Sequence, residues 1–191
     1  MARLKQEIDD TLDAGYKLIY IDETVFTRKT VRQSEWSGKG ENVHVDQNHL
    51  NEKPKALLMG ISAEEGVEQW RIFSKSVDTK KFLLYLDMVR EANENKKVAL
   101  FMDNLNVHRT KLAKKKMEEL GIRPIYNIYY QCELNPIESC FSKIKARFKS
   151  LRAAKLARGF KPNLHTLISQ SIKVLEKDYV HNCIGHARKQ F

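Results

Sequence analysis

The sequence predicts a single α/β domain built on a mixed β-sheet. Strand-like apolar runs alternate along the chain with amphipathic helical segments, which is the pattern of an α/β domain. One run, "KKVALFMD" at 96–103, is continuously apolar between charged flanks, as in a central strand buried on both faces. Two others, at 55–62 and 67–73, are joined by the turn sequence "AEEG", which indicates a hairpin. A chain of 191 residues is long enough for one such domain and short for two.

The chain before the hairpin predicts one strand and one insertion. Residues 1–15 are expected to form a short helix or a linker remnant. The stretch "YKLIYID" at 16–22 has a strongly apolar centre and predicts a strand that ends in an aspartate. Residues 23–55 are polar, with scattered charge and a lone Trp36, and we expect a long hairpin or loop insertion there.

The chain after the hairpin predicts four helices and two strands, each from local signals. Asp78 is a typical N-cap for the first of these helices, Gly121 a typical C-cap for the second, and Pro136 a favourable first residue of the third. The predicted helices cover 78–93, 108–120, 135–151 and about 162–179, and the strands cover 96–103 and 122–130. The helix from Asn135 keeps one apolar face over four turns, made by Ile137, Phe141, Ile144, Phe148 and Leu151.

Composition excludes several classes of protein. No apolar run approaches the roughly 18 residues needed to span a bilayer, so we expect no membrane partner and an intracellular location. Three cysteines without a CxxC pair make a disulfide framework or a common zinc site improbable. The net charge of +10 favours a polyanionic partner, nucleic acid first.

Two carboxylates occupy the ends of predicted strands, Asp22 after "LIYI" and Asp103 after "ALFM". Ligands bind at this edge of open α/β sheets, and buried carboxylates need a partner, for which Mg²⁺ or Mn²⁺ is suited. Glu138 is the candidate third ligand. An alternative stays open, because Asn135 and Glu138 also fit a capping box at the start of a helix.

The helix that carries Glu138 has a one-sided charge. From 139 to 161 there are eight Lys or Arg residues and no Asp or Glu. Glu138, Ser142, Lys145, Lys149 and Arg152 fall on one helical stripe, so a basic track starts at the proposed metal ligand. The expected DNA-binding residues are Lys143, Lys145, Arg147, Lys149 and Arg152.

The motifs "YIDET", "FMDNLNVH" and "LNPIESCFSKIK" resemble the catalytic core of Tc/mariner transposases and their bacterial insertion-sequence relatives. These belong to the DDE superfamily and have an RNase H-like fold. The 34 residues between Asp103 and Glu138 match the gap in Tc-like members. The resemblance implies a catalytic domain over 16–155, with 156–191 as its helical extension.

The resemblance also implies the chemistry. Asp22, Asp103 and Glu138 would be the catalytic triad and would hold two Mg²⁺ ions, with Mn²⁺ as a substitute. Asn104 and His108 match the D-N-x-x-x-H signature, and with Asn135 they would orient ligands or contact the DNA backbone. For His108, packing against the sheet at a helix start is an equal alternative.

The activity implied is cleavage at transposon ends and strand transfer into target DNA, with TA targets and a homodimer or higher oligomer on DNA. Two other functions stay open: an RNase H-like nuclease without strand transfer, and a domesticated DNA-binding protein. Location would be the nucleus in a eukaryote, and otherwise the cytoplasm or nucleoid. The region around Trp36 would reach a partner subunit, with a floppy hairpin as the alternative.

Two departures from the family pattern are visible. The family's Tyr-Ser-Pro turn before the glutamate is replaced by a segment with Gln131 and Cys132, and Glu133 adds a carboxylate nearby. Only about fifteen residues precede the first predicted strand, where family members carry helix-turn-helix modules. We therefore expect a catalytic fragment or another source of sequence specificity.

Overall fold

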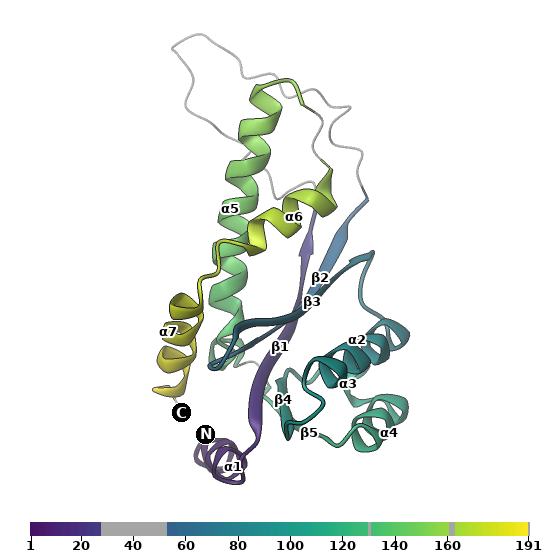
Figure 1. Cartoon of the computed structure of the whole chain (residues 1–191), viewed down its shortest axis with the longest axis vertical. Coiled ribbons are helices and arrows are strands. Elements are labelled where there is room, and N and C mark those ends of the chain that lie inside the picture. The colour runs from purple at the N-terminus through teal and green to yellow at the C-terminus, as the bar shows by residue number, and fades with distance from the viewer. Residues whose placement is uncertain (28–52, 130, 161–162, 191) are drawn as a thin grey trace.

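The computed structural model describes residues 1–27, 53–129, 131–160 and 163–190, which form an α/β domain around one five-stranded sheet (Figure 1). The sheet order is β3-β2-β1-β4-β5. The strands are β1 (Lys17–Phe26), β2 (Lys55–Ser62), β3 (Gly66–Ser74), β4 (Val98–Met102) and β5 (Ile122–Tyr126). Strands β1, β4 and β5 pair in parallel and β1, β2 and β3 antiparallel, which confirms the predicted mixed sheet.

Strand β1 joins the parallel half of the sheet to the antiparallel half. Its first part, 17–20, pairs in parallel with β4, and its second part, 20–26, pairs antiparallel with β2. The prediction that this strand ends at Asp22 is therefore wrong, because β2 supplies partners for four further residues. Thr24, Val25 and Phe26 are β-branched or aromatic and favour this extension. Residues 28–52, with Trp36, lie outside the described residues.

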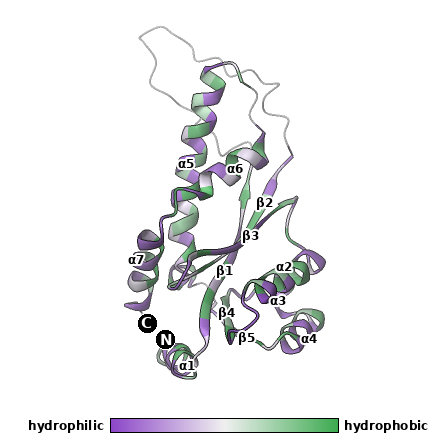
Figure 2. Ribbon diagram, viewed as in Figure 1, coloured by the Kyte–Doolittle hydropathy of each residue, from purple (hydrophilic) through white to green (hydrophobic). Residues whose placement is uncertain are grey.

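The helices cover both faces of the sheet, and two apolar clusters result (Figure 2). The α-helices are α1 (Ala2–Asp13), α2 (Thr79–Ala92), α3 (Asn106–Arg109), α4 (Lys111–Glu119), α5 (Ile137–Ala157), α6 (Leu164–Ile172) and α7 (Lys177–Arg188). One face, with Tyr20 and Phe101, packs against α1, α5, α6 and α7. The opposite face, with Ile21 and Leu100, packs against α2 and α4. Side-chain alternation along buried strands produces this division.

Several element boundaries differ from the prediction. The helix expected over 108–120 is divided at Thr110, where the backbone is extended. The Thr110 side-chain oxygen caps α4 by accepting from Ala113 N at 3.1 Å. The helix expected over 162–179 is likewise two helices, α6 and α7. The strand expected over 122–130 ends at Tyr126, and the chain then turns into a 3₁₀ helix, η3 (Cys132–Leu134).

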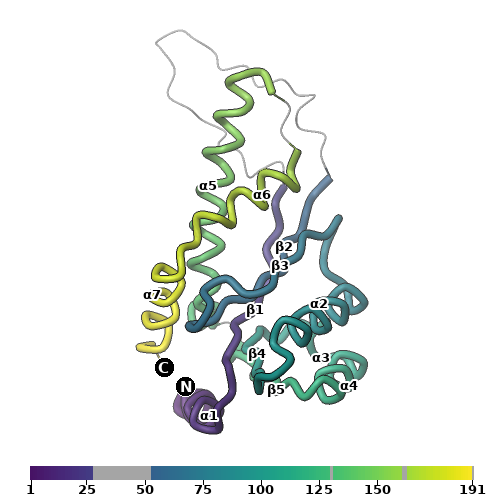
Figure 3. Tube along the Cα trace, viewed as in Figure 1, coloured from purple at the N-terminus to yellow at the C-terminus, as the bar shows by residue number. Residues whose placement is uncertain are grey.

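Other boundaries agree closely. The side chain of Asp78 accepts from Lys81 N at 3.0 Å and caps α2 as expected. Gly121 ends α4 with φ +64°, a conformation that glycine adopts readily. The first residues form a helix, α1, which lies beside α7 near the chain ends (Figure 3). Among the described helices, none has the length and apolarity to cross a bilayer.

Candidate active site

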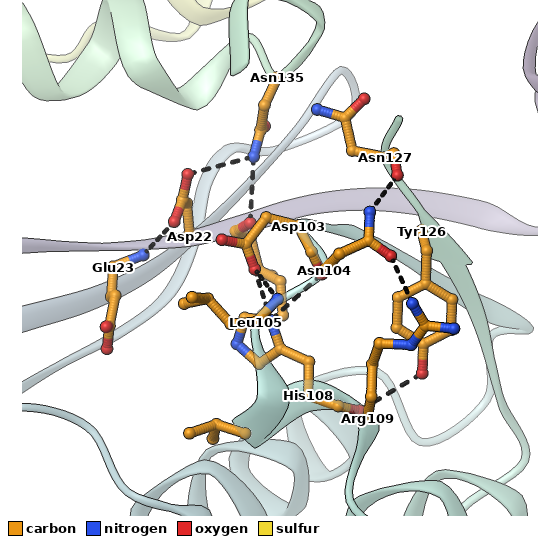
Figure 4. A network of polar contacts seen from close by, with 12 residues as sticks. Asp22, Glu23, Asp103, Asn104, Leu105, His108, Arg109, Tyr126, Asn127 and Asn135 are labelled. Atoms are coloured by element: carbon orange, nitrogen blue, oxygen red, sulfur yellow. Dashed lines mark hydrogen bonds and ion pairs between the residues drawn. The ribbon is translucent and has the colours of Figure 1, made fainter. Parts of the chain in front are cut away.

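Strand register brings Asp22 and Asp103 to the same level of the sheet. Tyr20 of β1 is paired with Phe101 of β4, and each aspartate lies two residues further along its own chain. Both side chains are therefore expected on the face of Tyr20 and Phe101, which α5 covers. Figure 4 shows the two carboxylates in one polar network, with the oxygens of Asp22 directed toward Glu23 N and Asn135. Asp22 is 9% exposed and the Asp103 side chain 36% exposed, so the pair lies at the edge of the core.

Two groups that follow it in the chain hold Asp103. Its Oδ1 accepts from Leu105 N at 3.1 Å and lies 2.8 Å from His108 Nδ1. His108 is buried and its ring packs against that of Phe82 on α2, with centroids 4.6 Å apart. One nitrogen of His108 thus contacts the Asp103 carboxylate while its ring packs on a helix, and its role in orienting a metal ligand stays a prediction.

The amide of Asn135 contacts Asp22. Asn135 Nδ2 lies 3.4 Å from Asp22 Oδ2 and donates to the Ile21 carbonyl at 3.2 Å. The other Asp22 oxygen accepts from Glu23 N at 2.7 Å. Asn135 Oδ1 is buried and has no hydrogen-bond partner among the described residues. The capping-box alternative is wrong, because α5 has no side-chain cap and the amide of Asn135 is used on β1.

Glu138 lies in the first turn of α5, three residues from Asn135, and its side chain is exposed. Its charge acts on Asp22. Within the described part of the chain, however, no group of three His, Cys, Asp or Glu side chains is close enough to hold a metal ion. The structure therefore places two of the three predicted ligands, Asp22 and Asp103, near one another. The third stays a prediction, because the exposed Glu138 side chain would have to turn toward the two aspartates.

Electrostatics identify the site as one that favours a cation. Burial, helped by the charges of Asp103 and Glu138, raises the pKa of Asp22 to about 7, although the hydrogen bond from Glu23 N lowers it. Burial also raises the pKa of Glu23, the next residue along β1. Two neighbouring carboxylates and the unpaired carboxamide oxygen of Asn135 are hard oxygen donors, the type that Mg²⁺ and Mn²⁺ take. The residues present fit such an ion in chemical kind.

Asn104 supports a neighbouring loop, and its side-chain hydrogen bonds within the described residues go to a backbone carbonyl and an arginine. Its Nδ2 donates to the Asn127 carbonyl after β5, and its Oδ1 accepts from Arg109 Nη1 at 3.0 Å. Arg109 also donates to the Tyr129 hydroxyl at 2.6 Å. Neither Arg109 nor Tyr129 was expected from the sequence, although Arg109 directly follows the D-N-x-x-x-H motif.

The segment before α5 replaces the family's Ser-Pro turn with side-chain hydrogen bonds. Asn127 Nδ2 donates to the Gln131 carbonyl at 2.6 Å, and Asn127 Oδ1 accepts from Ile128 N at 2.7 Å. Residues 132–134 then form η3, on which Cys132 and Glu133 are exposed. This loop sets where α5 begins, and therefore where Asn135 meets Asp22.

The basic residues of α5 separate into two groups. Arg147 and Lys149 are exposed and Lys145 is half-buried, as a DNA-facing track requires. The Lys143 ammonium lies 3.6 Å from the centre of the Tyr179 ring on α7. Arg152 is 2% exposed and belongs to the buried side of the helix. Its assignment to the exposed track is wrong, because the folded domain covers this side chain.

Comparison with known proteins agrees with this architecture. The sequence model described as DDE superfamily endonuclease matches residues 17–159. At the sequence level no curated relative matches the chain. A strand transfer complex of Mos1 has a similar fold, with TM-score 0.66 and 12% identity over 98% of this chain and 57% of that one. A Mos1 mariner paired end complex with Mn gives 0.64 and 13%, over 100% and 60%.

The Mos1 transposase catalytic domain, solved with raltegravir and Mg, matches over 99% of this chain and 95% of its own length, with TM-score 0.54 and 16% identity. This chain thus spans about three-fifths of the longer Mos1 chains and nearly all of their catalytic domain. At these identities the likeness concerns the fold, and it confirms the predicted RNase H-like architecture.

Proposed function

Because the chain belongs to the DDE superfamily endonucleases, we propose that it is the catalytic domain of a Tc/mariner-type DNA transposase. It cuts phosphodiester bonds at transposon ends and joins the resulting 3′-hydroxyl to target DNA. The observation that carries the proposal is the pair of neighbouring carboxylates, Asp22 and Asp103, level on adjacent parallel strands near the start of α5. A nonfunctional scaffold gains nothing from a buried carboxylate placed beside a second carboxylate.

The proposed ligands of divalent cations are Asp22, Asp103 and Glu138. When bound, two such ions would activate the attacking oxygen and stabilise the leaving one during in-line displacement at phosphorus. Each protein group has a supporting task in this scheme. His108 holds one oxygen of Asp103 and Asn135 contacts one oxygen of Asp22, so that each carboxylate is oriented by a polar side chain.

The substrate is double-stranded DNA in this proposal. The exposed cations Arg147 and Lys149 on α5 attract the phosphate backbone, and the helix leads toward Glu138 at its other end. The similar Mos1 structures are described as paired end and strand transfer complexes. We propose that this chain likewise works on DNA as a dimer or higher oligomer, with TA targets, in the nucleus of a eukaryote or otherwise in the cytoplasm or nucleoid.

The test is replacement of Asp103. In Asp103→Asn, cleavage of DNA carrying the element's ends in Mg²⁺ or Mn²⁺ is expected to disappear, while DNA binding in a gel-shift assay stays nearly intact. Asp9→Asn, an exposed carboxylate on α1, is the control and should cut normally. Cleavage by Asp103→Asn at the wild-type rate would contradict the proposal. Glu138→Gln tests the third ligand in the same assay.

A nuclease without strand transfer would have the same carboxylates, so a second assay separates the two. Pre-cleaved ends with free 3′-hydroxyls are mixed with plasmid and Mg²⁺. Joined products are expected from a transposase, and their absence beside normal cleavage would favour the nuclease. The same products, once sequenced, show whether insertion occurs at TA.

A further inference from the structure

A cation and two aromatic rings lie together beside Asp103. The Arg109 guanidinium lies over the Tyr126 ring, 5.2 Å from its centre, and donates to the Tyr129 hydroxyl at 2.6 Å. It is also bonded to Asn104, the residue that follows Asp103 (Figure 4). We call Arg109, Tyr126 and Tyr129 the Arg109 cluster.

Part of the Arg109 cluster is strongly exposed to solvent. Tyr129 is 60% exposed, and the neighbouring Leu105 is 41% exposed. The contact of Arg109 with the Tyr129 hydroxyl fixes one edge of that ring and leaves most of its surface in solvent. An exposed aromatic ring held in place beside a charged group offers a face on which another flat group can stack.

The arginine retains capacity for a ligand. Its hydrogen bonds to Asn104 and Tyr129 both use Nη1, whereas a guanidinium carries five N–H donors in a planar fork. The fork suits the oxygens of a phosphate, and the ring beneath it holds the plane of the group. An anionic group and a flat aromatic group are therefore the complementary partners, and a nucleotide contains both.

We propose that the Arg109 cluster binds an unpaired nucleotide of the DNA strand that flanks the bond to be cut. Tyr129 stacks on its base and Arg109 contacts its phosphate. This inference rests on the proposed function for the position of the strand. A base inside a duplex has both faces covered by its neighbours, so only an unstacked base offers a face to an exposed ring.

The experiment compares two DNA substrates of the same sequence in the presence of a chelator, so that binding is measured without cleavage. One is fully paired, and the other ends in a fork of unpaired nucleotides that includes 2-aminopurine. The wild-type chain should bind the fork more tightly and quench the 2-aminopurine. Tyr129→Ala should lose about tenfold in fork affinity, and Tyr129→Phe, which keeps the ring, should lose less than about threefold.

Arg109→Ala should weaken binding of the fork and lower its dependence on salt. Two matched controls come from residues outside the Arg109 cluster. Arg71→Ala removes another exposed arginine, which lies 5.8 Å from the Phe73 ring centre on β3, and Leu112→Ala removes a side chain that is 63% exposed. Both should bind the fork as the wild-type chain does. Circular dichroism checks that every variant is folded.

Equal loss on the paired and forked substrates in Tyr129→Ala, or equal effects of Tyr129→Ala and Tyr129→Phe, would overturn the stacking role. The outcome is independent of the chemistry. A chain that binds the fork through Tyr129 but does not cut in Mg²⁺ would support the nucleotide site and contradict the proposed function. A chain that cuts, and whose fork binding ignores Tyr129, would overturn this inference alone.

Discussion

At the residue scale, His108 has two separable contacts. Its Nδ1 lies 2.8 Å from Asp103 Oδ1, and its ring packs on Phe82 in the core. A motif match indicates that a histidine is wanted at this position but gives no information about which contact matters. The structure indicates that an apolar ring of similar size would preserve the packing and abolish the polar contact.

His108→Phe is therefore expected to fold with a melting temperature close to the wild type and to cut DNA about 10 to 100 times more slowly. His108→Ala should lose both stability and cleavage, because it also empties a buried site. Thermal unfolding and single-turnover cleavage measure the two effects. Full cleavage activity in His108→Phe would limit this residue to packing.

Asp22 gives the folded state a dependence on pH. The folded pKa of about 7 lies above the ordinary value of 3.8, so the fold resists ionisation of this carboxyl. In metal-free protein the free energy of unfolding should fall as pH rises from about 4 to 7, by an amount on the order of 4 kcal/mol. Urea unfolding in a chelator at pH 5 and pH 8 measures it.

Asp22→Asn should remove most of this slope, and Mg²⁺ should reverse it in the wild-type chain by stabilising the ionised form. Asp9→Asn, whose carboxyl is exposed in the wild type, should leave the slope unchanged. A wild-type chain whose stability does not fall over this range would show that Asp22 ionises freely in the fold.

At the element scale, α5 couples core packing to the site. Phe148 is fully buried and its ring packs 4.9 Å, centre to centre, from that of Phe26 at the end of β1. Just before α5 begins, Asn135 contacts Asp22 in the middle of β1. The helix is thus held to β1 at Phe148 and next to its first residue, and the position of Glu138 depends on both contacts.

Phe148→Ala should lower the free energy of unfolding by about 3 to 5 kcal/mol. Lys149→Ala, the exposed neighbour on the same helix, should change it by less than about 0.5 kcal/mol. Chemical unfolding measures both. A small effect of Phe148→Ala would mean that the core near Phe26 rearranges to fill the space.

The sequence predicted which elements exist better than where they stop. Hydrophobic period and caps predicted β2 and the start of α2, because these are local signals. The extension of β1 to Phe26 depends on pairing with β2, about thirty residues away in the chain, which local pattern does not contain. The break at Thr110 was missed because 108–120 keeps a helical composition through it.

The sequence likewise predicted some residues of the site correctly and missed the contacts of others. Asp22 and Asp103 stand out as charges after apolar runs, and the structure unites them. The use of Asn135 on Asp22 had no local signal, since the same residues fit a capping box better. Arg152 was placed on the exposed side because a helical wheel contains no information about the tertiary packing that covers this side chain.

At the scale of the whole molecule, the 10 excess positive charges do not all contribute equally to DNA binding. A cation contributes only if its charge reaches phosphate. The ammonium of Lys143 is held over Tyr179, whereas Arg147 and Lys149 are exposed on the same helix. Counting charges along a helix therefore overestimates its electrostatic contribution.

Replacing Lys145, Arg147 and Lys149 together by alanine should weaken DNA binding and reduce the slope of log affinity against log salt by about 1 per lost phosphate contact. Lys143→Ala should change the slope little, since its ammonium lies against Tyr179. Affinities measured from low to moderate salt test both. If Lys143→Ala changed the slope as much as Arg147→Ala or Lys149→Ala does, the distinction between Lys143 and the exposed cations would be contradicted.

Because Tyr20 is paired with Phe101, the proposed chemistry depends on the correct pairing of β1 with β4. A slip of one residue between β1 and β4 would turn one aspartate to the opposite side of the sheet, because side chains alternate. Such a molecule would contain both aspartates without bringing them together, and under the proposed function it would be unable to cut DNA. Cleavage would then require that the central strands have already paired in register.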